Sequence, residues 1–225
     1  MIPNASKTAD IRPQHWSTND PLKVQNCKMK LELAIATIAF TALMLQTYLN
    51  LAAVPDLIEC VWRMLTFFSI LANLGIALVM SRAVSQNELP SPRTSGAITV
   101  WAIVVGTFGH SFMHEVMPST TLEITVDHTL HTIVPVSTIL WWVLRAPKDG
   151  LTLFHVALWA VYPGAYLIYA MTRGAAEGFY PYPFIDPDIS STQTIILWLG
   201  ALIILCVTLG LTLVAASRSV FFQRV

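Results

Sequence analysis

The chain has few charged residues. Only 12% of its 225 residues are charged, whereas 55% are apolar. An ordinary soluble domain carries about 25% charged residues, so this composition argues against a chain built of soluble domains. The formal net charge is zero, and nothing in the charge pattern indicates nucleic-acid binding.

Cysteine is also scarce. The three cysteines, Cys27, Cys60 and Cys206, are odd in number and far apart in the sequence. In the topology inferred below, Cys27 lies in the cytoplasm and Cys206 in the membrane. Since disulfides are rare in the cytosol, we predict no structural disulfide.

The apolar residues form long blocks. A bilayer core of about 30 Å requires about 20 mostly apolar residues per helix. The blocks predict an all-α, polytopic membrane protein: a six-helix transmembrane domain (31–217) between a polar N-terminal arm (1–30) and a short tail (218–225). The first block follows 30 polar residues and is too long for a cleaved signal peptide. The six predicted spans are residues 31–54, 61–84, 97–117, 122–145, 151–172 and 193–216.

The distribution of lysine and arginine predicts the orientation. Eleven of the 13 lie in the arm, in the tail, or in the loops after the second and fourth spans. The other two are Arg63 and Arg173. Because cytoplasmic loops carry the excess of positive residues, both termini are expected in the cytoplasm. We expect an integral protein of a plasma or inner membrane.

Histidines are concentrated at one depth of the predicted bundle. Ionisable residues in a span are costly and usually face the bundle interior or a cavity. His110 and His114 fall in the outer half of the third span, and His128 and His131 in the outer half of the fourth. His155 begins the fifth span, near the cytoplasmic face.

Prolines predict two kinks. Pro135 lacks the N–H that would bond the carbonyl of His131, so the kink in the fourth span should centre on that histidine. Pro163, followed by Gly164, has the same effect in the fifth span. Either kink has two interpretations, one architectural and one functional.

A polar stripe in the second span lies at a depth comparable to that of these histidines, which it could meet if the second and fourth spans are close. Thr66, Ser69 and Asn73 recur at helical spacing. A threonine hydroxyl becomes a nucleophile only beside a base, most commonly histidine, and His131 lies at the depth of Thr66. In a helix, however, threonine most often bonds a carbonyl of its own helix. The pattern therefore leaves Thr66 open between packing and catalysis.

A metal or haem site is the competing interpretation of the histidines. His110 and His114 share one helical face, and Asp127, His128 and His131 offer further ligands of types that zinc and iron accept. The zinc motif with glutamate directly after the first histidine is absent, because Ser111 follows His110.

Three segments resemble motifs of the androgen-induced-gene-product-like family of six-span membrane proteins. The likeness covers most of residues 31–216 in order and spacing. In the animal motif one more residue separates the histidine pair from the proline, so the turn after His131 should differ here. The motifs are Trp62-Arg63-Met64-Leu65-Thr66-Phe67, His128-Thr129-Leu130-His131-Thr132-Ile133-Val134-Pro135 and Tyr182-Pro183-Phe184.

The resemblance implies an activity. Animal members are intramembrane threonine hydrolases of esters between fatty acids and hydroxy fatty acids. Transferred by position, Thr66 would be the nucleophile and His131 the base. The expected partner is a lipid with acyl chains, and no cofactor is expected. The supporting residues are Ser69, Asn73, His110, His114 and His128, of which Asn73, His110 and His128 are candidate oxyanion donors.

The function of the chain and the role of one loop stay open. The chain could instead be a metal- or haem-binding protein, or a lipid-binding or transport protein without turnover. The aromatic, proline-rich stretch 178–184 could be an interfacial belt or a lid over a lipid-facing pocket. The sequence does not indicate the physiological ester or the oligomeric state.

Overall fold

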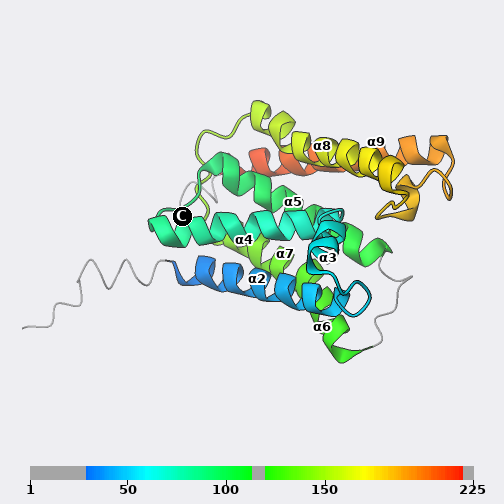
Figure 1. Cartoon of the computed structure of the whole chain (residues 1–225). Coiled ribbons are helices and arrows are strands. Elements are labelled where there is room, and N and C mark those ends of the chain that lie inside the picture. The colour runs from blue at the N-terminus through cyan, green and yellow to red at the C-terminus, as the bar shows by residue number, and fades with distance from the viewer. Residues whose placement is uncertain (1–28, 113–119, 220–225) are drawn as a thin grey trace, which may run out of the picture.

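The computed structural model describes residues 29–112 and 120–219, without the side chains of 110–112. The regular elements of this part are all helices, with no strand, as predicted (Figure 1). Most of the arm and tail lies outside the described residues. The elements are α2 (Lys30–Asn50), α3 (Leu57–Met64), α4 (Phe68–Gln86), α5 (Pro92–Phe112), α6 (Thr121–His128), the π-helix η2 (Thr129–Ile133), α7 (Val134–Leu144), α8 (Leu153–Glu177), the 3-10 helix η3 (Pro183–Ile185) and α9 (Thr192–Ser217).

Among the described residues, four helices are long and apolar enough to cross a membrane. They are α2, α4, α8 and α9, which lie in the first, second, fifth and sixth predicted spans. The third predicted span corresponds to α5, and the fourth to the run α6–η2–α7. Membrane crossing by these two segments, and the orientation, stay predictions. α8 continues through Pro163 as a single helix.

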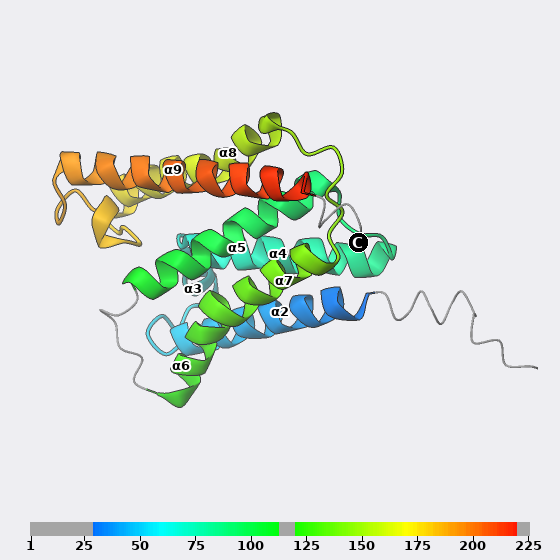
Figure 2. The same cartoon turned by 180° about the vertical axis from the view of Figure 1, so that it is seen from behind.

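α5 lies at the centre of the bundle. In Figures 1 and 2, α8 and α9 run side by side on one side of it, while α2, α4 and α7 lie on the other. It contacts α4, α7, α8 and α9. Gly96 permits the approach to α8, because a Cβ there would come within 2.2 Å of the Trp159 ring. The Trp159 indole N–H donates to the Arg93 carbonyl at 2.9 Å.

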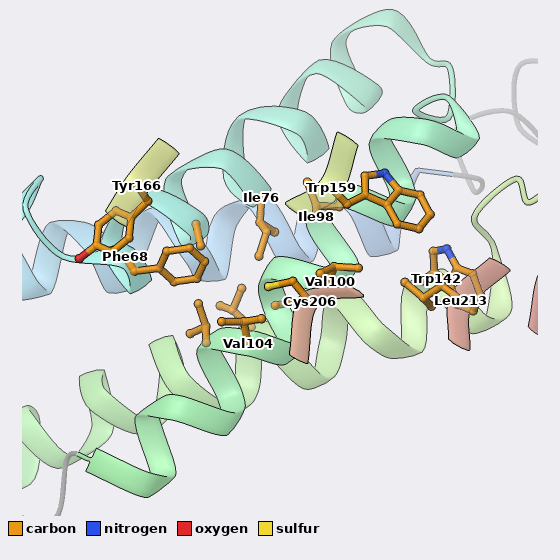
Figure 3. Close-up of a cluster of buried hydrophobic side chains, with 14 of the residues drawn as sticks. Phe68, Ile76, Ile98, Val100, Val104, Trp142, Trp159, Tyr166, Cys206 and Leu213 are labelled. Atoms are coloured by element: carbon orange, nitrogen blue, oxygen red, sulfur yellow. The ribbon is translucent and has the colours of Figure 1, made fainter. Parts of the chain in front are cut away.

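The apolar side chains divide between a core and an outer surface. Ile76, Val100 and Cys206 lie in the core drawn in Figure 3 and are almost inaccessible. Ile168 and Leu197 are 71% and 73% exposed. Large exposed apolar side chains on the candidate spans fit a surface that faces lipid rather than water.

The second predicted span is not one continuous helix, which corrects the prediction. α3 ends at Met64 and α4 begins at Phe68, because Phe67 is extended (φ −87°, ψ 132°). Ser69 and Asn73 lie on α4, but Thr66 lies in the break and is not part of their helical stripe. No glycine or proline occurs at 65–67, so these residues do not by themselves explain the break.

Candidate functional site

Three tyrosines satisfy the backbone groups that the break exposes. The Tyr166 hydroxyl donates to the Thr66 carbonyl at 2.9 Å, and the Tyr169 hydroxyl to the Leu65 carbonyl at 3.2 Å. The Phe68 N–H donates to the Tyr182 hydroxyl oxygen at 3.2 Å. Because backbone polar groups in an apolar bundle need partners, these bonds stabilise the interruption. Figure 3 shows Tyr166 beside Phe68, with ring centroids 5.1 Å apart.

The hydroxyl of Thr66 differs from those of the other buried threonines. Thr99 and Thr138 each donate to the carbonyl four residues back, on Ser95 and Val134, at 2.8 Å. Thr66 is fully buried, yet its Oγ1 has no hydrogen-bond partner among the described residues. The break removes the helical geometry on which the usual bond depends. Thr66 therefore does not bond its own helix, and a buried unsatisfied hydroxyl calls for another explanation.

His131 lies in a π-helical turn. The Val134 N–H bonds the Thr129 carbonyl, five residues back, and Pro135 follows without an N–H. Single π turns within α-helices often occur at functional sites. The structure thus has a π turn at the histidine on which the predicted kink centres. Asn73 on α4 supports the turn by donating to the Leu130 carbonyl at 3.2 Å.

Asp127 orients the His131 ring. Nδ1 of His131 lies 2.8 Å from Oδ1 of Asp127 and 3.1 Å from the Asp127 carbonyl oxygen. A neutral histidine that donates from Nδ1 keeps the Nε2 lone pair as an acceptor, as a general base requires. Sequence reasoning did not assign Asp127 this role. The signal was its i, i+4 spacing from His131 on one helical face.

Glycines on α5 make room for the ring. A Cβ on Gly109 would lie 2.5 Å from Cδ2 of His131 and 2.7 Å from its Cγ, closer than real contacts allow. A Cβ on Gly106 would lie 3.5 Å from the His131 carbonyl oxygen, an ordinary contact. The backbone of α5 therefore packs directly against the buried imidazole, which is 8% exposed.

A cavity of about 80 Å³ brings several of these groups together. Ser69, His131 and Tyr182 all line it, with Phe68 and Phe108. A smaller, mostly apolar cavity of about 30 Å³ shares Phe68, Phe108 and Tyr182 with it and extends to Leu202 on α9. Thr66 is not among the lining residues, and its hydroxyl is not bonded to His131. The predicted Thr66–His131 contact is therefore not formed in this structure.

The aromatic loop after α8 contributes Tyr182 to the cavity wall. The Tyr182 ring packs edge-on against Phe67 (centroids 6.1 Å apart, 88°) and stacks on Phe184 (5.2 Å, 12°). Phe179 in the same loop is 44% exposed. Burial raises the pKa of the Tyr182 phenol above its ordinary value, although hydrogen bonds partly oppose this. The hydroxyl therefore keeps its proton at neutral pH.

The other predicted residues have different roles or are not described. Asn73 uses its Nδ2 on the Ser69 and Leu130 carbonyls, and His128 is exposed at the end of α6. His155 caps α8 by accepting the Thr152 N–H at 3.0 Å. The His110 side chain and all of His114 lie outside the described residues. Within the described part of the chain, no three His, Cys, Asp or Glu side chains form a metal-binding group.

No family model, curated protein or solved structure matches the chain.

Proposed function

We propose that this protein is an intramembrane lipid-ester hydrolase with Thr66 as nucleophile and His131 as general base. One observation carries the proposal: Thr66 keeps a buried hydroxyl that has no partner among the described residues, next in sequence to residues that line a cavity with an oriented histidine. Other buried threonines are committed to backbone carbonyls. The resemblance of residues 62–67 and 128–135 to a family of threonine hydrolases supports the same assignment.

The reaction has two halves. Thr66 Oγ1 attacks the ester carbonyl carbon while Nε2 of His131 takes the hydroxyl proton, and a tetrahedral oxyanion forms. The bond to the leaving oxygen then breaks, and His131 gives its proton to the departing alcohol. Water next attacks the acyl-threonine; His131 accepts its proton and returns it to Thr66 Oγ1 as the fatty acid leaves. Asp127 keeps the imidazole in the required tautomer throughout.

The mechanism requires Thr66 and His131 to approach each other when substrate binds. Catalytic hydrogen bonds in ligand-free enzymes are often long and tighten only in the substrate complex. Rotation of the Thr66 side chain and a shift of the neighbouring Phe67 would open its hydroxyl to the cavity. Ser69 already lines that cavity, so it is the alternative hydroxyl that an experiment must separate from Thr66.

The proposed substrate is an ester with long acyl chains. A cavity of about 80 Å³ suits an ester group rather than a whole lipid, and its apolar neighbour beside α9 suits the first carbons of a chain. We further propose six spans with both termini in the cytoplasm. The 21 residues of α5 reach about 31 Å at 1.5 Å per residue, which matches the hydrocarbon core.

The test is covalent labelling of the purified protein by an alkyl fluorophosphonate, followed by mass spectrometry of the labelled peptide. We expect the label on Thr66, with loss of labelling and of ester turnover in Thr66→Ala and His131→Ala. The matched control Thr138→Ala should keep both, and Ser69→Ala, which tests the alternative hydroxyl, should keep the label on Thr66. A label on Ser69, or turnover retained in Thr66→Ala, would transfer the nucleophile role to another residue.

A second measurement addresses the competing metal interpretation. Elemental analysis and the visible spectrum of the same preparation would detect a metal or haem. Wild-type protein that carries a stoichiometric metal, takes no label and hydrolyses no ester would overturn the hydrolase proposal.

A further inference from the structure

We propose that Tyr182 is a catalytic residue whose hydroxyl donates the hydrogen bond that stabilises the oxyanion. This inference rests on the proposed hydrolase function. It concerns a different atom and step from those of Thr66 and His131, and so has its own test. Tyr182 lines the cavity together with His131 and Ser69.

The hydrogen bonding of Tyr182 leaves its proton available. In the bond with the Phe68 N–H, the tyrosine oxygen is the acceptor, so its own O–H is not used there. The hydroxyls of Tyr166 and Ser69 interact with it, and its proton can turn among these groups and the cavity by rotation about the C–O bond. A donor already held by a backbone amide needs little reorganisation when charge develops.

The ring is held in position by its neighbours. It contacts Phe67 edge-on and stacks on Phe184, and the loop that carries it begins at Gly178, which ends α8 with a φ of 70°. Residues Phe67 and Phe68 directly follow the proposed nucleophile in the sequence. The same bond that fixes the Phe68 amide therefore fixes the donor relative to the chain at Thr66.

Three other polar groups near the cavity are less suited to this role. Asn73 directs its Nδ2 to two carbonyls, and the Tyr166 hydroxyl donates to the Thr66 carbonyl. His128 is exposed. Among these described groups, Tyr182 combines a place on the cavity wall with a proton not committed to the backbone.

The role involves no net proton transfer from Tyr182. As Thr66 attacks, the carbonyl oxygen gains a negative charge and accepts the Tyr182 O–H. When the leaving alcohol departs, the carbonyl re-forms and the hydrogen bond weakens. Removing one such donor typically lowers kcat by about 10²–10³-fold.

Tyr182→Phe tests the proposal, because it removes the hydroxyl and keeps the ring. We expect kcat to fall about 10²–10³-fold with little change in KM. Inhibition by a long-chain alkyl trifluoromethyl ketone, which forms a tetrahedral adduct, should weaken by a similar factor. Binding of the matching methyl ketone, which stays largely trigonal, should not change. Tyr180→Phe is the control, since Tyr180 is in the same loop and packs on Gly174 but lines neither cavity.

The outcomes separate the two proposals. If wild-type protein turns over esters and Tyr182→Phe does so equally well, the oxyanion role is wrong while the hydrolase proposal stands. If Tyr182→Phe weakens both ketones equally, Tyr182 only supports the structure and the catalytic role is again wrong. If wild-type protein neither hydrolyses esters nor binds the trifluoromethyl ketone more tightly, both proposals fail.

Discussion

The two ends of the bundle bury polar side chains in opposite ways. At the end where α2 begins and α7 finishes, Glu32 is fully buried, and its Oε1 accepts the Trp141 indole N–H at 2.7 Å and pairs with Nε of Arg145 at 3.0 Å. The helices there are regular. At the other end, the chain is not helical between α3 and α4, and η2 is a π-helix. The Thr66 hydroxyl has no hydrogen-bond partner among the described residues.

The contrast shows how an irregular backbone changes which polar groups are hydrogen-bonded. At the Glu32 end the partners bind the side chain, so the buried carboxylate joins α2 to α7. At the Thr66 end the tyrosines bind the backbone, so the side chains of the break remain available. Burial of a polar group is thus expected to contribute to stability at one end and to reactivity at the other.

The largest expected effect on stability is at the Glu32 end. Glu32→Ala leaves the Trp141 N–H and the Arg145 guanidinium without their buried acceptor, and we expect a loss of about 3–5 kcal/mol of unfolding free energy. Ester turnover per folded molecule should not change. Thermal unfolding in detergent measures the first quantity and active-site titration the second. The control Glu59→Ala removes an exposed partner of Arg63 and should cost about 0–1 kcal/mol; a lower turnover per folded molecule in Glu32→Ala would contradict the claim that Glu32 contributes to stability and not to catalysis.

The opposite phenotype is expected at Asp127. Asp127→Asn still reaches Nδ1 of His131 but favours the wrong tautomer, so kcat should fall by roughly 10²–10³-fold. Stability should change little, because the Asp127 side chain is 28% exposed. Steady-state kinetics beside thermal unfolding would separate the two quantities. Asp56→Asn is the control, since asparagine can also cap α3. Unchanged kcat in Asp127→Asn would remove Asp127 from the mechanism.

The sequence predicted the features that depend on local pattern. Long apolar blocks predicted the helices, and Pro135 drew attention to the backbone at His131, where the structure has a π turn. The helices follow from the apolar composition of each segment, and the irregular turn from the missing N–H of Pro135. Both are properties of neighbouring residues, which a single sequence displays.

Features that depend on distant residues could not be predicted. The break at Thr66 contains no helix-breaking residue, and it is stabilised by Tyr166, Tyr169 and Tyr182, each at least 100 positions away in sequence. An apolar stretch predicts a continuous helix whether or not such partners exist elsewhere in the chain. For the same reason, the similar depth of Thr66 and His131 did not predict whether their side chains point toward each other. A break in the helix changes the direction of the Thr66 side chain.

Packing against His131 gives a smaller effect at the Thr66 end. Gly109→Ala drives a methyl group into the imidazole, so we expect a loss of about 1–3 kcal/mol of unfolding free energy together with reduced turnover. Gly106→Ala, whose Cβ meets ordinary contacts at 3.5 Å, should be close to neutral. Both variants are compared by thermal unfolding and ester turnover. Equal effects from the two substitutions would show that α5 does not set the position of His131.

A modest expected change in stability tests the reason for the break itself. Tyr166→Phe removes the donor to the Thr66 carbonyl, at a cost of about 1 kcal/mol. The control Tyr162→Phe removes a buried hydroxyl that bonds nothing in the described structure and keeps a ring that also packs on Phe68. It should therefore cost less.

The informative result is how the backbone and hydroxyl of Thr66 respond to Tyr166→Phe. Without Tyr166, the chain gains by extending the helix through 65–67, which would let the Thr66 hydroxyl bond the Trp62 carbonyl four residues back, as Thr138 bonds Val134. Amide hydrogen exchange at Thr66 and Phe67 should then slow, and turnover should fall more than stability does. Faster exchange with full turnover would mean that the break does not keep the hydroxyl available, and the difference between the two ends would have another cause.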